Sequence, residues 1–104
     1  MNEKHYKLRF ISLFEDDLNS IVDYIALGLQ NQTAADALVD DVQQAICDRL
    51  PYAESFEHYY SLKTREYPYY RIYVRNYTVY YVVIGDIMEV RRILYSKRAV
   101  SEEI

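Results

Sequence analysis

The sequence predicts a two-layer α+β domain, in which two antiparallel helices pack on one face of a mainly antiparallel, four-stranded sheet. Two observations support this fold class. Residues 69–95 are rich in tyrosine, valine and isoleucine, which favour strands, and Arg75-Asn76 and Gly85-Asp86 interrupt them as hairpin turns do. Ahead of them lie one alternating segment and two segments with helical periodicity. The expected order is therefore β-α-α-β-β-β, because two amphipathic helices suffice to cover one face of such a sheet.

The chain is expected to begin with a strand and a helix. Residues 6–11 alternate apolar and polar side chains, which is typical of a strand with one buried face. Ser12 and Glu15 have the spacing of a capping box, so the sequence predicts a helix over 13–30. The apolar positions that recur at helical spacing are Phe14, Leu18, Ile21, Val22, Ile25 and Leu29.

A second helix is expected over 33–50. Thr33 and Asp36 resemble another N-cap arrangement, and Pro51 ends the periodicity. The polar turn between the two helices is short, which implies an antiparallel pair. The segment that follows shows no clear period, although Tyr59 to Lys63 could form a short strand.

Three strands are expected over 69–75, 77–84 and 87–95, and side-chain alternation sorts their residues onto two faces. Pairing of 70–74 with 79–83 predicts a core face that carries Tyr70, Ile72, Val74, Val79, Tyr81 and Val83. The opposite face is expected to stay open and to carry Arg71, Tyr73, Arg75, Thr78, Tyr80 and Val82. With two-residue turns, Arg71, Tyr80 and Arg91 would lie side by side on this second face.

Arg91 and Arg92 are neighbours on the last strand, and adjacent strand residues point to opposite faces. One guanidinium must therefore enter the side covered by the helices, or the strand must bulge at this point. A bulge after Arg91 would also bring Ile93 onto the core face. The sequence leaves the two alternatives open.

Composition indicates an ordinary globular protein. The 104 residues are expected to form a single domain, 1–104, with 99–104 as a flexible tail. No signal peptide is expected from the charged first residues, no apolar run is long enough to span a membrane, and the one cysteine cannot form an internal disulfide. A cytoplasmic protein that does not act at membranes is therefore expected.

Charge is distributed unevenly along the chain, whose net charge is -4. Residues 1–50 hold four Lys and Arg against nine Asp and Glu, a net charge of -5. Residues 63–98 hold eight Lys and Arg against three acids, a net charge of +5. Because local fields steer partners more than the total charge does, the strand region is expected to meet an anionic or acidic partner.

No motif for metal, phosphate or covalent chemistry is present in the sequence. His5 and His58 lack the spacing of a zinc site, and a chain with two glycines has no phosphate-binding loop. Cys47 lies beside the core position Ile46 and is expected to be buried rather than nucleophilic. The helix acids, Asp17 among them, are expected to form solvated faces. The sequence thus predicts no cofactor and no metal, and it identifies no catalytic residue.

The chain resembles the RelE/ParE superfamily of toxins from type II toxin–antitoxin systems along nearly its whole length. The likeness rests on the segments YKLRFI, FEDDLNSIVDYIA, AADALVDDVQQAICDRL, YYRIYVRNYTVYYVV and VRRILYSKR. The positions within them that match the family pattern are Tyr70, Arg71, Tyr77, Val79, Tyr81, Ile93 and Arg98. The resemblance implies the fold given above, with the first strand beside the last, and a small toxin that a cognate antitoxin neutralises.

The resemblance also implies one of two activities. The RelE-like branch cleaves messenger RNA on the ribosome with basic residues of the open sheet face and often a C-terminal tyrosine or histidine–tyrosine pair. The ParE-like branch poisons DNA gyrase and is not known as an enzyme. This chain has Thr78 where the RelE-like branch has an arginine, and no aromatic residue or histidine follows Tyr95. RNA cleavage also needs a proton acceptor near neutral pH, which the sequence does not offer.

The ParE-like branch, without catalytic activity of its own, is therefore favoured. The alternatives are a RelE-like, ribosome-dependent mRNA endonuclease and a non-toxic interaction module of the same fold. The expected partners are a cognate antitoxin and DNA gyrase, or the ribosome with messenger RNA under the first alternative. The residues expected to contact target and antitoxin are Arg71, Tyr73, Tyr80, Arg91 and Arg98, because cations between aromatic rings suit an acidic amphipathic segment.

Overall fold

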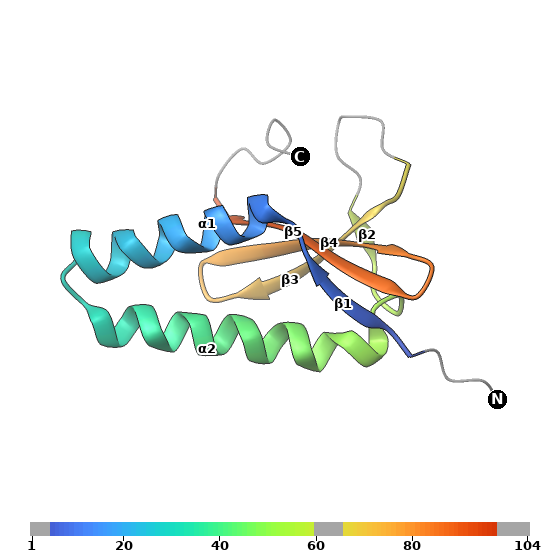
Figure 1. Cartoon of the computed structure of the whole chain (residues 1–104), viewed down its shortest axis with the longest axis horizontal. Helices are drawn as coiled ribbons and strands as arrows, with labels where there is room; N and C mark the ends of the chain where they lie inside the picture. The colour runs from blue at the N-terminus through green and yellow to red at the C-terminus, as the bar shows by residue number, and fades with distance from the viewer. Residues whose placement is uncertain (1–4, 60–65, 98–104) are drawn as a thin grey trace.

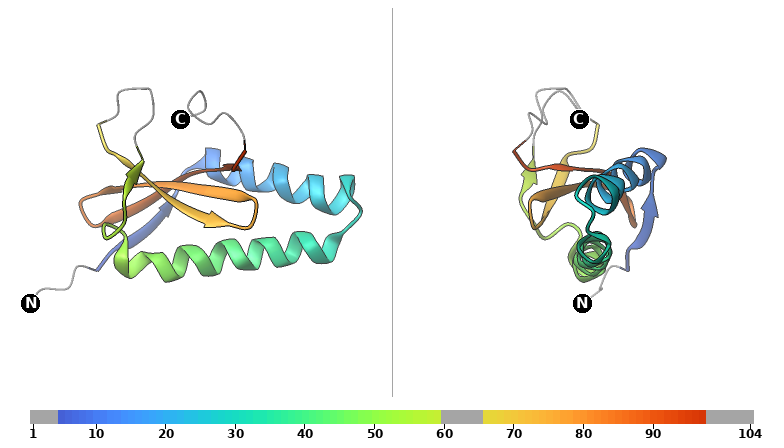
Figure 2. Two further views of the ribbon diagram at one scale, coloured as in Figure 1. Left: turned by 180° about the vertical axis from the view of Figure 1, so that it is seen from behind. Right: turned by 90° about the vertical axis from the view of Figure 1, so that its left-hand side faces the viewer.

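The computed structural model describes residues 5–59 and 66–97. In it, two helices form an antiparallel pair that covers one face of a twisted sheet (Figure 1, Figure 2). The sheet has five strands in the order β1-β5-β4-β3-β2. The predicted two-layer α+β architecture is confirmed, with one strand more than the four that were expected.

The strands are β1 (Lys7–Phe10), β2 (His58–Tyr59), β3 (Tyr69–Val74), β4 (Tyr77–Ile84) and β5 (Ile87–Tyr95). β1 runs parallel to β5, beside the last strand as the resemblance implied, and all other neighbours are antiparallel. The additional strand, β2, pairs with the outer edge of β3. It shares Tyr59 with the short strand expected from the sequence, whose remaining residues lie outside the described ranges.

The helices are α1 (Ser12–Asp23), which continues as a π-helical segment (Tyr24–Gly28), and α2 (Gln32–Arg49), which ends in a 3₁₀ turn (Leu50–Tyr52). Both predicted N-caps are wrong. The N–H of Ile11 still donates to β5, so β1 passes directly into α1 and Ser12 is already helical. α2 is capped by Asn31, whose Oδ1 accepts a hydrogen bond from the N–H of Ala34 at 3.0 Å, and not by Thr33.

The main core lies between the helices and the sheet. Its helix members include Phe14, Leu38, Val42 and Ile46, and its strand members include Tyr70, Ile72, Val74, Val79, Tyr81, Met88, Val90 and Ile93. The predicted core face is confirmed, with Val83 packed against this core but only partly buried. Side-chain alternation alone therefore identified which residues of β3 and β4 face the core.

The opposite sheet face is not open, contrary to the prediction. Tyr69, Tyr80, Val82 and Leu94 form a second buried cluster on it. Tyr59 of β2, which pairs with β3, and Tyr67 pack against this cluster. Only the outer parts of this face remain available for contacts.

The tip of the helix pair extends past the sheet (Figure 1). Leu29, which was expected in the core, is therefore 57% exposed, and Tyr24 and Leu27 are also exposed. The apolar stripe of α1 is buried only where sheet or α2 lies beneath it. Neither helix of the described part has the length and apolar content that crossing a membrane requires.

Candidate functional site

A bulge in β5 decides which way its two adjacent arginines point. Tyr80 pairs with Arg92 and Tyr81 pairs with Val90, so Arg91 is the extra residue. The strand therefore bulges, which is one of the two alternatives left open by the sequence, and the bulge brings Ile93 onto the core face. The expected alignment of Arg91 directly beside Tyr80 is wrong by one residue, because the bulge places Arg92 there.

Arg92 is held by Asp17 of α1. Its Nε donates to Oδ2 of Asp17 at 2.7 Å and its Nη2 donates to Oδ1 at 2.9 Å. The N–H of Ile93 donates to the same carboxylate at 3.1 Å, so Asp17 also satisfies a backbone donor beside the bulge. The side chains of Arg92 and Asp17 are only 16% and 14% exposed. Asp17 was expected on a solvated face; instead it fastens α1 to β5.

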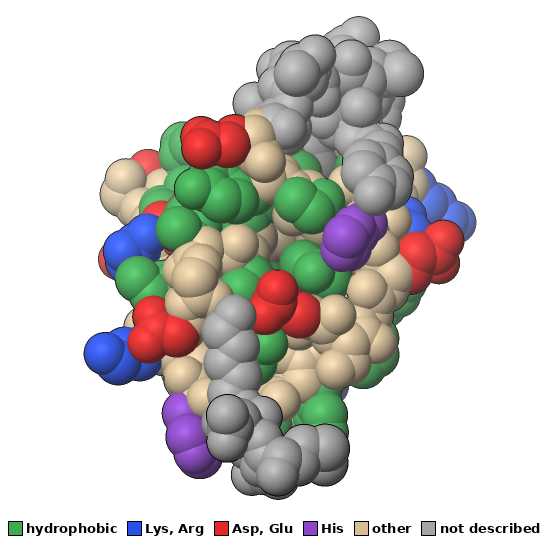
Figure 3. All heavy atoms as spheres, turned by 90° about the vertical axis from the view of Figure 1, so that its right-hand side faces the viewer, with side chains coloured by type: hydrophobic (Ala, Val, Ile, Leu, Met, Phe, Trp, Pro, Cys, Tyr) green, Lys and Arg blue, Asp and Glu red, His purple; other side chains and the backbone are tan. Residues whose placement is uncertain are grey.

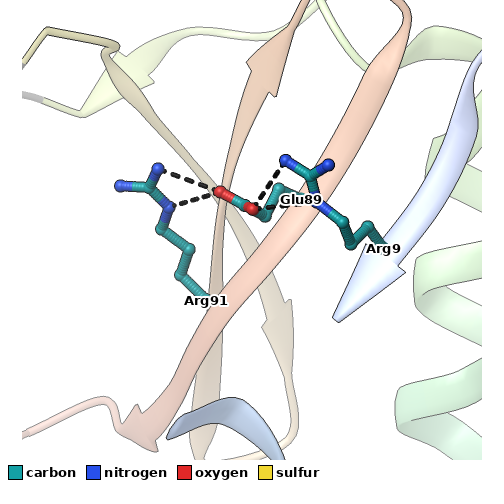
Figure 4. A network of polar contacts seen from close by, with 3 residues as sticks. All are labelled: Arg9, Glu89 and Arg91. Atoms are coloured by element: carbon teal, nitrogen blue, oxygen red, sulfur yellow. Dashed lines mark hydrogen bonds and ion pairs between the residues drawn. The ribbon is translucent and has the colours of Figure 1, made fainter. Parts of the chain in front are cut away.

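On the sheet face opposite the helices, Glu89 of β5 lies between Arg91 of its own strand and Arg9 of the neighbouring strand β1 (Figure 4). Arg9 of β1 donates to Oε1 through Nε at 3.0 Å and through Nη2 at 2.9 Å. Arg91 donates to Oε2 through Nε and Nη2, each at 2.9 Å. Burial by itself would raise the pKa of Glu89, but the hydrogen bonds and charges of Arg91 and Arg9 outweigh it and lower the pKa. Two guanidinium charges against one carboxylate leave this trio positively charged.

The lowered pKa of Glu89 predicts a pH-dependent stability. This contribution is present above the unfolded-state pKa of about 4.3 and is lost as pH falls through the lower pKa of the folded state. Glu89→Gln should cost about 2 kcal/mol near neutral pH, because two arginines lose their carboxylate. The variant should also lose less stability than the parent between about pH 5 and pH 3.

Thermal melts of both proteins across this range measure the difference. Asp86→Asn is the matched control, since its carboxylate is exposed and lies 4.0 Å from the Lys7 ammonium. If the melting temperatures of the parent and Glu89→Gln changed in parallel with pH, Glu89 would not be the source of the pH-dependent stability.

Guanidinium groups lie over aromatic rings on the same face as Glu89. The Arg71 guanidinium lies 4.6 Å from the ring centroid of Tyr59 and 5.6 Å from that of Tyr73. The Arg91 guanidinium lies 6.0 Å from the ring centroid of Tyr69. We refer to Arg9, Arg71, Tyr73 and Arg91 as the cationic surface. Cations held over ring faces keep their charge available to an anionic partner.

Tyr80 lies beneath this surface. Its ring centroid is 5.7 Å from that of Tyr59 and 6.2 Å from that of Tyr69, and the residue is 3% exposed. Burial is the main cause that raises the pKa of Tyr80, so its hydroxyl stays protonated at neutral pH. Tyr73, by contrast, is 65% exposed. Tyr80 can therefore support the surface, whereas Tyr73 presents a ring to a partner.

The structure thus brings together most of the predicted contact residues. Arg71, Tyr73 and Arg91 belong to the cationic surface, and Arg71 pairs with Tyr80 in the predicted register. Arg98 lies outside the described residues. Sequence reasoning missed Arg9, although alternation in β1 placed it on the face opposite Leu8 and Phe10, and the resemblance placed β1 beside β5.

The end of the molecule that contains the start of β1 and the end of α2 has a different character. Figure 3 shows hydrophobic and acidic side chains across its middle, with Lys and Arg at its sides. Arg49 donates to the hydroxyl of Tyr81 at 3.0 Å, and that hydroxyl donates to the carbonyl oxygen of Ala53 at 2.7 Å. Nε2 of His58 lies 3.0 Å from the Tyr70 hydroxyl, away from the cationic surface. Within the described ranges, no three His, Cys, Asp or Glu side chains gather as metal ligands would.

Two comparisons place this geometry among known proteins. Residues 8–100 match the family model described as "ParE toxin of type II toxin-antitoxin system, parDE". The fold is similar to a solved chain described as "Chromosomal ParDE TA system from P. aeruginosa", with a TM-score of 0.71 and 15% sequence identity over 90% of this chain and 99% of that chain. At this identity the likeness shows the fold alone. No curated protein matches the chain.

Proposed function

The chain belongs to the ParE toxin family of type II toxin–antitoxin systems, and from this premise we propose that it arrests growth by poisoning DNA gyrase until a cognate antitoxin neutralises it. The family match over residues 8–100 is the observation that carries the proposal. The cationic surface supports it, because an otherwise acidic chain gathers exposed and partly exposed cations and an exposed aromatic ring on one side of its sheet.

The chemistry of this surface favours a contact role over RNA cleavage. Cleavage through a 2′-hydroxyl requires a group that accepts a proton near neutral pH. Glu89 has a lowered pKa and both its oxygens are occupied by arginines, which makes it a poor proton acceptor. His58 contacts Tyr70 and lies away from this surface. The described residues of the cationic surface therefore supply positive charge but no side chain suited to accept the 2′-hydroxyl proton.

Arg71 and Tyr73 are proposed as the main contacts for both target and antitoxin, together with Arg91 and Arg98, with Tyr80 as their support. An acidic helix or strand of the antitoxin would lie across the rings and pair with the guanidinium groups. Charge at such an interface mainly sets the association rate and its salt dependence, while the aromatic rings anchor the complex.

Arg71→Glu is expected to slow antitoxin association about tenfold at low salt and to weaken toxicity. The melting temperature should stay nearly unchanged, because the Arg71 guanidinium has no ion-pair partner among the described residues and lies over the partly buried ring of Tyr59 and the exposed ring of Tyr73. Arg91 is left unchanged in this test, since reversing its charge would place a second carboxylate beside Glu89.

Stopped-flow association with the protein encoded by the neighbouring gene measures the effect. Arg75→Glu is the matched control, because Arg75 makes an exposed ion pair with Asp41 of α2 instead. Equal slowing by both variants would attribute the effect to net charge. Unchanged association and toxicity with Arg71→Glu would exclude the cationic surface as the contact site.

Growth after induced expression tests the function itself. We expect arrest on expression of the chain alone and recovery when the neighbouring gene is co-expressed. Primer extension on messenger RNA from the arrested cells should show no new cuts. Cuts in phase with codons would replace the gyrase proposal by the RelE-like one, and growth without arrest would indicate a non-toxic interaction module.

A further inference from the structure

Arg49 is the last residue of α2, and its side chain contacts three other segments on the helix side of the sheet. Its Nη1 donates to the carbonyl oxygen of Arg71 in β3 at 3.1 Å and to the hydroxyl of Tyr81 in β4 at 3.0 Å. Its guanidinium carbon lies 3.5 Å from the ring centroid of Phe56, which belongs to the chain that leads into β2. One side chain therefore joins the end of α2 to two strands and to the segment before a third.

The charge of Arg49 is not used in an ion pair within the described ranges. The residue is partly buried, yet the ion pairs of the described residues all involve other cations. Moving a cation out of water without a counter-charge is unfavourable, and an unbranched apolar side chain such as methionine would avoid that cost. An arginine supplies in addition a rigid planar fork, which donates hydrogen bonds in its plane and stacks on a ring with its face. Its particular contribution here is therefore the geometry that it imposes on its neighbours.

The backbone of Arg71 is held by this fork from the helix side, while the Arg71 side chain lies on the opposite face. The pairing of β2 with β3 involves Tyr69 and Tyr70, so Arg71 is the first residue of β3 beyond that pairing. The hydrogen bond from Arg49 thus fixes a carbonyl group at the point where β2 no longer does. A shift of this carbonyl group would also move the Cα atom of Arg71 and, with it, the guanidinium on the other face.

Arg49 also contacts the segment that carries the aromatic support of Arg71. Tyr59 follows Phe56 by three residues, and its ring centroid lies 4.6 Å from the Arg71 guanidinium. β2 has only two residues, and so short a strand is held weakly by its backbone pairing. The stacking of Arg49 on Phe56 gives the chain before β2 a further point of attachment. Both members of the stacked pair on the far face therefore depend on one arginine.

We propose that Arg49 is a positioning residue for the cationic surface. From the helix side it fixes the carbonyl group of Arg71, and through Phe56 it fixes the segment that carries Tyr59. It thereby sets the place of the Arg71 guanidinium over its ring. The inference rests on the proposed function for the role of the cationic surface in binding. It goes beyond that function by assigning control of this surface to a residue on the other side of the sheet.

The Arg71 side chain reports its own placement in the NMR spectrum of the whole protein. Protons that lie over an aromatic ring are shifted upfield by its ring current, so the δ-methylene signals of Arg71 should be shifted upfield in the parent. Tyr59→Leu removes the ring and gives the unshifted reference. Arg49→Met should move the signals at least halfway to that reference, and Arg49→Lys, which keeps the charge but not the planar fork, should lie between.

A second variant keeps this test available if Arg49→Met folds poorly. Phe56 is 48% exposed, so Phe56→Leu removes the stacked ring at a position outside the core. It should shift the Arg71 signals in the same direction as Arg49→Met, without any change of net charge. Unchanged Arg71 signals in both variants would overturn the inference.

Association with the protein encoded by the neighbouring gene separates placement from stability. Stopped-flow measurements well below the melting temperatures should show association with Arg49→Met slowed about threefold at low salt. Asp17→Asn is the matched control, because it weakens the attachment of α1 to β5 without touching Arg71, and it should associate at the parent rate. In an Arg71→Ala background, Arg49→Met should have no further effect, since no guanidinium remains to be placed. An effect of net charge alone would persist in that background and would overturn the inference, as would equal slowing by Asp17→Asn.

The two measurements also separate this inference from the proposed function. The NMR signals need no partner, so they can establish the placement of Arg71 by Arg49 in a chain that fails to arrest growth. Conversely, the parent can arrest growth and be neutralised while the Arg71 signals are the same in the parent, Arg49→Met and Phe56→Leu. In that case the inference is wrong and the function stands.

Discussion

Val79→Asp is expected to unfold the domain. Val79 is 0% exposed in the middle of β4 and packs in the core between helices and sheet. An unpaired carboxylate at this position would cost several kcal/mol, a large share of the 5–15 kcal/mol by which domains of this kind are stable. Circular dichroism and thermal melting of the variant measure the loss.

Tyr73→Asp is the matched control for this variant. Tyr73 lies on the adjacent strand but is 65% exposed on the other face, so its carboxylate would stay in water. That variant should melt cooperatively, close to the parent. A soluble, cooperatively melting Val79→Asp protein would show that the two sheet faces have been assigned the wrong way round.

Asp17→Ala is expected to destabilise the protein by about 3–5 kcal/mol. The change would remove the carboxylate that accepts two hydrogen bonds from the largely buried guanidinium of Arg92 and one from the N–H of Ile93. Asp17→Asn, which keeps an acceptor but loses the charge, should have an intermediate effect. Urea unfolding gives the free energies of unfolding for the series.

Two further variants separate the ion pair from a general effect on α1. Asp16→Ala changes an exposed acid in the same helix turn and should stay within about 0.5 kcal/mol of the parent. Asp17→Ala combined with Arg92→Met should recover part of the loss, because the largely buried positive charge is then removed as well. Equal stabilities of the Asp16 and Asp17 variants would show that the pair does not fasten α1 to β5.

Elements with a regular period could be predicted from the sequence. Alternation assigned the core face of β3 and β4 correctly, and a shift of the turn at Arg75 would not have changed it, because it moves the pairing by two positions. The helices followed from their apolar stripes. Their ends did not, because Ile11 is still bonded to β5 and Asn31 lies before the periodic region.

Features that depend on a distant partner could not be predicted. β2 has two residues, too few to show a period, so the cover it gives to Tyr80 was missed. The role of Asp17 depends on the bulge at Arg91, and a bulge changes which strand residue faces the helix. The contact of Glu89 with Arg9 likewise depends on the register of β1 against β5, which places Arg9 opposite Glu89.

Cys47 illustrates the limit of a helical pattern. Its neighbour Ile46 points at the sheet and is buried, as the stripe predicts. Cys47, which was expected to be buried, is exposed one step further around α2, where β1 ends the sheet and a groove between β1, α1 and α2 begins. The pattern finds the apolar side of the helix, but only the width of the sheet decides how much of that side is covered.

Gyrase-mediated DNA cleavage tests the proposed activity most directly. Purified protein is incubated with DNA gyrase, supercoiled plasmid and ATP, and the reaction is stopped with detergent and protease. We expect linear DNA to accumulate with increasing protein, less so with Arg71→Glu, and not when the antitoxin is added first. Unchanged supercoiling and no linear DNA at any protein concentration, in cells that nevertheless stop growing, would contradict the assignment of gyrase as the target.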